Sequence, residues 1–143
     1  MPLIIEHIDA IARAKKRGVL FVEFRRPEDE NDGFRLGNLA QSWKTLPERQ
    51  QVIDWLDAHG VAWSRCSHFV NVSLMMGYRG QIYIDLPFDT DLPAFQALDA
   101  FLVNPDGSMR LPNTVFIYLP LELAMKNAHH DEPGFWDQWA ASF

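Results

Sequence analysis

Cysteine and long hydrophobic runs are scarce in this sequence. Cys66 is the single cysteine of the 143 residues, so no disulfide can form within the chain. No apolar stretch approaches the roughly 20 residues that a membrane-spanning helix requires. The first eighteen residues mix acids and bases with isoleucines and lack the basic-then-apolar order of a signal peptide. These absences predict a cytoplasmic protein with no membrane partner.

The common catalytic motifs are missing as well. The sequence has no glycine-rich phosphate loop, dinucleotide fingerprint, G-x-S-x-G elbow or H-E-x-x-H zinc motif. Asp85, Asp89 and Asp91 are spaced four and then two residues apart around a proline, which does not fit a calcium loop. A lone cysteine also lacks the C-x-x-C pair of a thioredoxin-like site. We therefore expect no cofactor and no metal.

Acidic residues outnumber basic ones, and they do so unevenly. The net charge is −6, and residues 27–143 hold sixteen acidic and seven basic residues. An acidic surface repels phosphate, which argues against a nucleic-acid partner. The basic residues 13–17 are explained by the end of a helix, where cations offset the negative end of the helix dipole.

The composition is that of an ordinary globular protein, 48% hydrophobic and 22% charged, and 143 residues fit a single domain, 1–143. Hydrophobic periodicity predicts helices over 3–17, 45–59, 91–102 and 120–128, and strands over 19–24, 70–74, 82–86 and 114–119. The second and third strands form a hairpin across the Gly77–Gly80 turn. In its return strand, Tyr83 should lie on a wetter face than Ile82 and Ile84.

Between its two ends the chain reads strand, helix, strand, strand, helix, strand. This order predicts an α+β fold with a ferredoxin-like βαββαβ core, a mixed sheet, an extra N-terminal helix and further C-terminal helices. One feature favours an alternative. The segment 115–119, "VFIYL", is apolar on both faces although the pattern puts it at a sheet edge, so a three-layer α/β/α fold is the other interpretation.

Local signals predict where the helices begin and end. Gly18 supplies the left-handed residue that ends the first helix. Thr45 can cap the second, with Glu48 as its capping-box partner, and Gly60 ends it. Thr90 or Asp91 can cap the third.

Residues 26–44 form a long polar loop with no hydrophobic period. Its four acidic residues lie close together, and it carries the large aromatics Phe34 and Trp43. We expect it to be solvated and to offer these two aromatics, amid negative charge, to a basic protein.

Cys66 and His68 are weak candidates for catalysis. Two residues apart, they would share one face of an extended strand with Ser64, where a thiolate and an imidazole could pair. Their spacing of nearly 7 Å is long for a hydrogen bond. The alternative is that Cys66 is a small buried hydrophobe.

The segment 129–136, "HHDEPGFW", suggests a metal site at first sight. His129 and His130 are neighbours, however, and on a helix they point about 100° apart. They fit better as the end of one helix before the next, 131–143. That last helix carries Phe135, Trp136 and Trp139, which either clasp the protein's own sheet edge or form an interface.

Three functions follow from these patterns. The one favoured is a non-enzymatic protein-binding or regulatory module, such as a small acidic inhibitor or immunity-type protein, that uses the acidic loop and exposed aromatics. An enzyme of unrecognised class using Cys66 and His68, or the cluster 129–132, is the first alternative. A homo-oligomer subunit with the terminal helix as its contact is the second.

Overall fold

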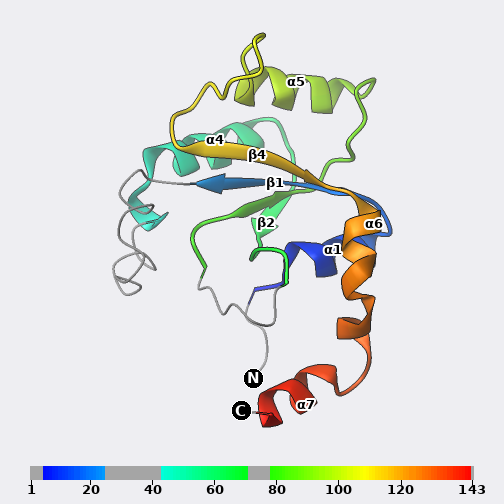
Figure 1. Cartoon of the computed structure of the whole chain (residues 1–143). Coiled ribbons are helices and arrows are strands. Elements are labelled where there is room, and N and C mark those ends of the chain that lie inside the picture. The colour runs from blue at the N-terminus through cyan, green and yellow to red at the C-terminus, as the bar shows by residue number, and fades with distance from the viewer. Residues whose placement is uncertain (1–4, 25–42, 71–77, 143) are drawn as a thin grey trace.

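The computed structural model describes residues 5–24, 43–70 and 78–142, and it shows an α+β fold (Figure 1). The strands are β1 Val19–Phe24, β2 Trp63–Arg65, β3 Ile82–Ile84 and β4 Thr114–Leu119. The α-helices are α1 Ile8–Lys15, α4 Pro47–Ala58, α5 Pro93–Leu102, α6 Leu121–Ala124 and α7 Phe135–Ala141. Two 3₁₀ segments complete the list, η1 Trp43–Thr45 and η2 Met125–Asp131.

The strands form one open sheet in the order β2-β3-β1-β4, and every neighbouring pair is antiparallel. The prediction of a mixed sheet is therefore wrong. β1 and β2, the strands that α4 connects, both run antiparallel to β3 and hence parallel to each other. Because β3 lies between them, they share no hydrogen bonds, and the parallel pair implied by the strand-helix-strand order is never formed.

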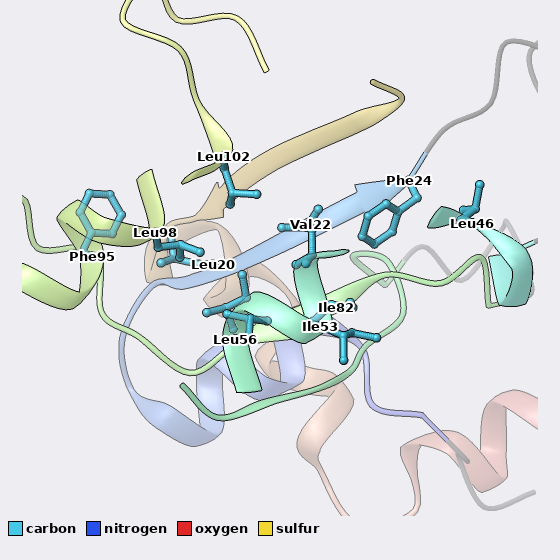
Figure 2. Packing of buried hydrophobic residues seen from close by; sticks show 12 residues of the cluster. Leu20, Val22, Phe24, Leu46, Ile53, Leu56, Ile82, Phe95, Leu98 and Leu102 are labelled. Carbon is cyan, nitrogen blue, oxygen red and sulfur yellow. The ribbon is translucent and has the colours of Figure 1, made fainter. Parts of the chain in front are cut away.

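One face of the sheet packs against α4 and α5. Figure 2 shows this apolar cluster, in which Leu20 and Val22 of β1 meet Leu56 of α4 and Leu98 of α5. All four side chains are at most 1% exposed. Helices of this kind are stabilised mainly by such burial of one apolar face rather than by their intrinsic propensity.

The opposite face packs against α1 and α6. Ile8 and Ala12 of α1 and Ala124 of α6 cover Phe21 of β1 and Tyr83 of β3. All six residues of β1 are consequently buried. Tyr83 is only 5% exposed, so the wetter face predicted for β3 is wrong at this residue: α1, which precedes the sheet in sequence, covers it.

Three helix ends differ from the predictions made from local signals. Leu92, rather than Thr90 or Asp91, occupies the N-cap position of α5, with no side-chain cap. α1 ends at Lys16, which takes the left-handed conformation at φ 57°, rather than at Gly18. Gly18 is required for space instead, since a Cβ there would come within 2.2 Å of the Tyr118 hydroxyl. α4 begins after Leu46, with Pro47 in its first turn, so Thr45 is not its N-cap; Gly60, at φ 68°, follows its end as expected.

The hairpin partner of β3 is also displaced from the prediction. Ile84 pairs with Trp63 and Ile82 with Arg65, so the described partner strand is β2, 63–65, rather than 70–74. Residues 71–77, which carry most of the predicted strand, lie outside the described ranges. So do residues 25–42, which include Phe34 and most of the predicted polar loop.

The chain after β4 is less regular than the predicted helix over 120–128. It is α-helical only through Ala124 and then continues as the 3₁₀ segment η2 with a kink at Asn127. The Asn127 side chain donates to Asp9 Oδ2 at 2.6 Å and to the Val70 carbonyl at 3.3 Å. These bonds across the fold hold the kinked segment in place. No helix within the described ranges is both long and apolar enough to cross a membrane.

Candidate functional site

A buried ionic network holds the C-terminal segment against α1. Arg13 is 8% exposed and donates from Nε and Nη2 to the two oxygens of Asp131 at 2.7 and 2.9 Å. Its Nη1 donates to the Ala124 carbonyl at 3.0 Å. The hydrogen bonds from Arg13 lower the pKa of the Asp131 carboxyl. Such bidentate pairs constrain orientation as well as adding energy, so Arg13 holds Asp131, the last residue of η2, against α1.

Asp9 is the second anchor of this network. It is fully buried, and its carboxylate accepts from the Asn127 side chain at 2.6 Å and from the Val70 N–H at 3.3 Å. Arg13 lies one helical turn later, with Nη1 3.4 Å from Asp9 Oδ2. A buried charge needs such partners because its desolvation is costly. The i, i+4 spacing of Asp9 and Arg13 was the only signal of this network in the sequence.

Beyond the network, six aromatic rings from three segments gather around α7. They belong to His7, His129, His130, Phe135, Trp136 and Trp139. Trp136 is central: its ring centroid lies 5.1 Å from that of His130, 5.6 Å from that of Trp139 and 6.2 Å from that of His7. The structure thus brings together the predicted residues of 129–139. It adds His7, for which no sequence pattern indicated a role.

His130 is buried within this cluster. It is 5% exposed, and among the described residues its Nδ1 has no hydrogen-bond partner. Burial, reinforced by the neighbouring His129, lowers the pKa of His130, so its ring is mainly neutral at pH 7. A neutral, packed ring adds no cation at a helix end. Packing, rather than the helix dipole, therefore explains why a histidine lies at this position.

The aromatic side chains of α7 are only partly covered. None of residues 135–141, all of which the structure describes, is buried, and Phe135, Trp136 and Trp139 are half-buried. Figure 1 shows α7 beyond the end of η2, away from the sheet. Glu6, Glu132 and Asp137 are exposed around it. We call Phe135, Trp136, Trp139, His7 and His129 the aromatic face.

His68 lies in a different polar group under α1, and Cys66 lies apart from it. The His68 Nδ1 is 2.7 Å from Oε1 of the buried Glu23, whereas Cys66 is fully buried in the apolar cluster of this face. Burial and the nearby Glu23 raise the pKa of the Cys66 thiol to about 12. At neutral pH it is therefore a protonated thiol, which is a poor nucleophile.

His7 joins this polar group to the aromatic face. Its Nδ1 lies 3.0 Å from the His68 carbonyl oxygen and 2.8 Å from Ser67 Oγ, while its ring stacks on Trp136. Backbone bonds hold the same place: Ser67 N–H donates to Glu6 at 2.9 Å and Ile8 N–H donates to Ser67 at 3.1 Å. The start of α1 is thus held by Ser67 and His68 on one side and by Trp136 on the other.

The other predicted candidates lie elsewhere. Trp43 is half-buried against the α4/α5 core, where its ring meets Tyr78 at 4.9 Å and the Arg49 guanidinium at 4.5 Å. His59 is exposed after α4, stacked on Trp55. These residues serve packing on the far side of the sheet from the aromatic face.

The described residues offer no metal centre, and a modest hollow lies beside α1. Within 5–24, 43–70 and 78–142, no three His, Cys, Asp or Glu side chains are placed to share a metal ion. A half-open hollow of about 370 Å³ lies between the start of α1 and β2, lined by Ile5, Glu6, Ile11, Ser64 and Arg65. It contains neither Cys66 nor His68. Comparison of the chain with protein-family profiles, curated sequences and solved structures gave no match.

Proposed function

We propose that this protein is a non-enzymatic protein-binding or regulatory module that uses the aromatic face as its contact surface. The observation that carries the proposal is the state of α7: three large aromatics on a seven-residue helix, none of them buried. So short a helix is not stable by itself in water. Its half-buried rings become the centre of an interface once a partner covers them.

The way in which α7 is held supports this proposal. Directional bonds from Arg13 to Asp131, stacking on His7 and a tilted ring contact with His130 position it, while its outer surface stays open. A helix that only closed the core would bury its aromatics. Here buried charged residues help to hold aromatics in place at the surface. This is expected when a binding face must be preorganised.

The surrounding charge suggests the partner. Glu6, Glu132 and Asp137 border the aromatic face, and the chain carries a net charge of −6. A basic protein with an apolar groove would complement both features, and its approach would be faster at low ionic strength. A cytoplasmic partner suits the single, protonated cysteine.

The enzyme alternative has less support. Its strongest nucleophile, Cys66, is buried with a raised pKa and lies in an apolar cluster. Its histidines occupy separate places: His68 beside Glu23, His59 after α4 and His129 beside α7. Among the described residues, no hydrogen bond or ring contact joins any two of these groups into a nucleophile and base.

We further infer that the scaffold is one domain with a ferredoxin-like core. The strand order β2-β3-β1-β4, with α4 and α5 as the two crossover helices on one face, supports this topology. α1 and α6 then form an additional layer on the other face. This fold supports many activities, so it adds nothing to the choice of function.

The proposal is tested by capture of partners from a cell lysate with the wild-type chain and with Trp136→Ala/Trp139→Ala. We expect bound proteins to fall roughly tenfold or more for the double variant, the loss typical of truncated interface hot spots. Capture should also weaken as salt is raised. Phe88→Ala is the matched control, since Phe88 is a 51% exposed aromatic beside α5, and it should retain full capture.

Thermal unfolding of the same variants separates binding from stability. Loss of capture with nearly unchanged unfolding supports the proposal. Two results would overturn it: equal capture by wild type and double variant, or destabilisation of the double variant by as much as a buried core truncation, about 3 kcal/mol. The second result would make Trp136 and Trp139 part of the core.

A further inference from the structure

β4 is the last strand of the sheet and is paired on one side only. It hydrogen-bonds to β1 along its whole length, and within the described ranges no strand lies on its other side. The opposite edge, β2, has three residues and carries Arg65, whereas β4 has six and carries no charge. β4 is therefore the edge open to pairing with another strand.

The hydrogen bonds of the sheet show which residues of β4 face outward. Cys66 N–H donates to Gln81, and Asp85 N–H donates to Ala62, so Gln81 and Asp85 face β2. In a strand the backbone groups of successive residues alternate between the two sides. Ile82 and Ile84 consequently face β1.

The backbone groups of β1 alternate in the same way. Leu20 and Val22, the partners of Ile84 and Ile82, face β3, and Phe21 therefore faces β4. Its partner Ile117 faces back to β1. The N–H and C=O groups of the alternate residues Thr114, Phe116 and Tyr118 point away from the sheet.

This edge lacks the features that usually prevent pairing. Edge strands are normally protected by a charge, a proline within the strand or a bulge. The sequence 111–121 has no charged residue, and its prolines lie outside β4 at 112 and 120. Val115, Phe116 and Ile117 are half-buried, and Tyr118 is 40% exposed. Apolar side chains on both faces thus stand partly uncovered.

We propose that the β4 edge is the interface of a homodimer, in which β4 pairs antiparallel with β4 of a second copy about a two-fold axis at Phe116. Phe116 then lies opposite its own equivalent, and Thr114 lies opposite Tyr118 of the other copy. All outward-facing backbone groups of the strand find partners. Val115 and Ile117 gain neighbours on the other face. The two sheets become one continuous sheet of eight strands.

Charge favours a second copy in this orientation. In the sequence, the nearest charged residues on either side of Phe116 are Arg110 and Glu122, each six positions away and each exposed. Antiparallel pairing brings the Arg110 end of one strand beside the Glu122 end of the other. Parallel pairing would bring like charges together. The edge is thus complementary to itself, as a two-fold interface requires.

Sedimentation velocity across protein concentrations tests the proposal, with Tyr118→Lys as the variant. The wild-type chain of 16.5 kDa should sediment as a dimer. Tyr118→Lys should dissociate at least tenfold more readily, because it adds a charge within the edge strand. Phe88→Lys is the matched control: Phe88 stacks on Tyr118 at 4.6 Å but lies outside the strand, so this variant should remain dimeric.

Amide hydrogen exchange identifies the surface used. In the dimer, exchange at Thr114, Phe116 and Tyr118 should slow as concentration rises, while Ile117 is protected at every concentration by its bond to β1. A monomer at all concentrations overturns the proposal. So does a dimer whose Phe116 and Tyr118 amides exchange freely, or one that dissociates equally in both lysine variants. Protection that appears only when another protein is added would assign the edge to that partner instead.

Discussion

The two faces of the sheet are stabilised in different ways. The face under α4 and α5 packs through a large cluster of buried apolar side chains, including Leu56 and Leu98. The face under α1 and α6 buries polar groups within its packing, among them Asp9, Arg13 and Glu23. Apolar burial is strong but has little directional preference, whereas a buried ion pair is sensitive to geometry. The first face therefore stabilises the fold, and the second positions a particular segment.

That difference explains why the candidate site lies where it does. The aromatic face is built at the end of the polar side, where Arg13 holds Asp131 and His7 stacks on Trp136. Placement of a surface helix needs directional contacts, because the helix buries too little area to be held by the hydrophobic effect. The two faces should consequently respond differently to substitution, to loss of charge and to pH.

The largest effect is expected on the apolar face. Leu56→Ala removes a fully buried side chain from the α4/α5 cluster and should lower the free energy of unfolding by about 2–5 kcal/mol. Leu123→Ala in α6 is the matched control: Leu123 is 41% exposed, and its loss should cost under about 1 kcal/mol. Denaturant unfolding of both variants checks this. A small effect of Leu56→Ala would show that the α4/α5 face is not the main source of stability.

A smaller effect is expected from Arg13→Met on the polar face. Its removal leaves the buried Asp9 without its cation and should cost about 3 kcal/mol. Lys15→Met is the control, because Lys15 is exposed and its 3.5 Å contact with Asp85 is a surface pair, with an expected cost below about 1 kcal/mol. Adding Asp9→Leu to Arg13→Met should restore part of the loss. If it does not, the cost of leaving the buried Asp9 carboxylate without its cation is not the cause of the loss.

The smallest effect is a dependence of stability on pH that comes from the polar face. The folded state lowers the pKa of His130 from 6.5 through burial, so the unfolded chain binds the proton more readily. The associated stability is present above pH 6.5 and is lost as pH falls through the folded pKa. Unfolding measured from pH 8 to pH 5 should show this decrease. His130→Phe should remove it.

The Asp131 carboxylate affects stability in a lower pH range. Hydrogen bonds from Arg13 lower the pKa of Asp131 from 3.8, so its contribution is present above that value and is lost below it as pH falls. Because the Asp131 side chain is 54% exposed, solvent weakens the effect. Asp131→Asn should reduce the pH dependence of the free energy of unfolding in the acid range alone. An equal reduction between pH 8 and pH 5 would contradict the assignment of the two pH ranges to His130 and Asp131.

Local patterns predicted most of the secondary structure but not how its ends are placed. β1 and β4 are continuous apolar runs, and α4 and α5 begin with Pro47 and Pro93 in the first turn, so each could be found from nearby residues. The end of α1 could not be found in this way, because the left-handed residue there is Lys16 and not Gly18. Gly18 is needed instead for its fit against Tyr118, a hundred residues away.

The candidate site was predicted in part for the same reason. Phe135, Trp136 and Trp139 share a helical spacing that any reader of the sequence can see. The stacking of Trp136 on His7 and the bond between Arg13 and Asp131 join residues more than a hundred positions apart. The predicted roles of Phe34 and the acidic loop remain predictions, since residues 25–42 lie outside the described ranges.

The sequence by itself determined the α+β class, the apolar strands and the unusual aromatic end, because each depends on the side chains of one short segment. Only the tertiary structure decided that the sheet is antiparallel throughout, that Cys66 is an inert buried thiol and that His130 is packed rather than charged. Those properties depend on which distant segment covers a residue. Burial and pairing are relations between parts of the chain, and hydrophobic period alone does not specify them.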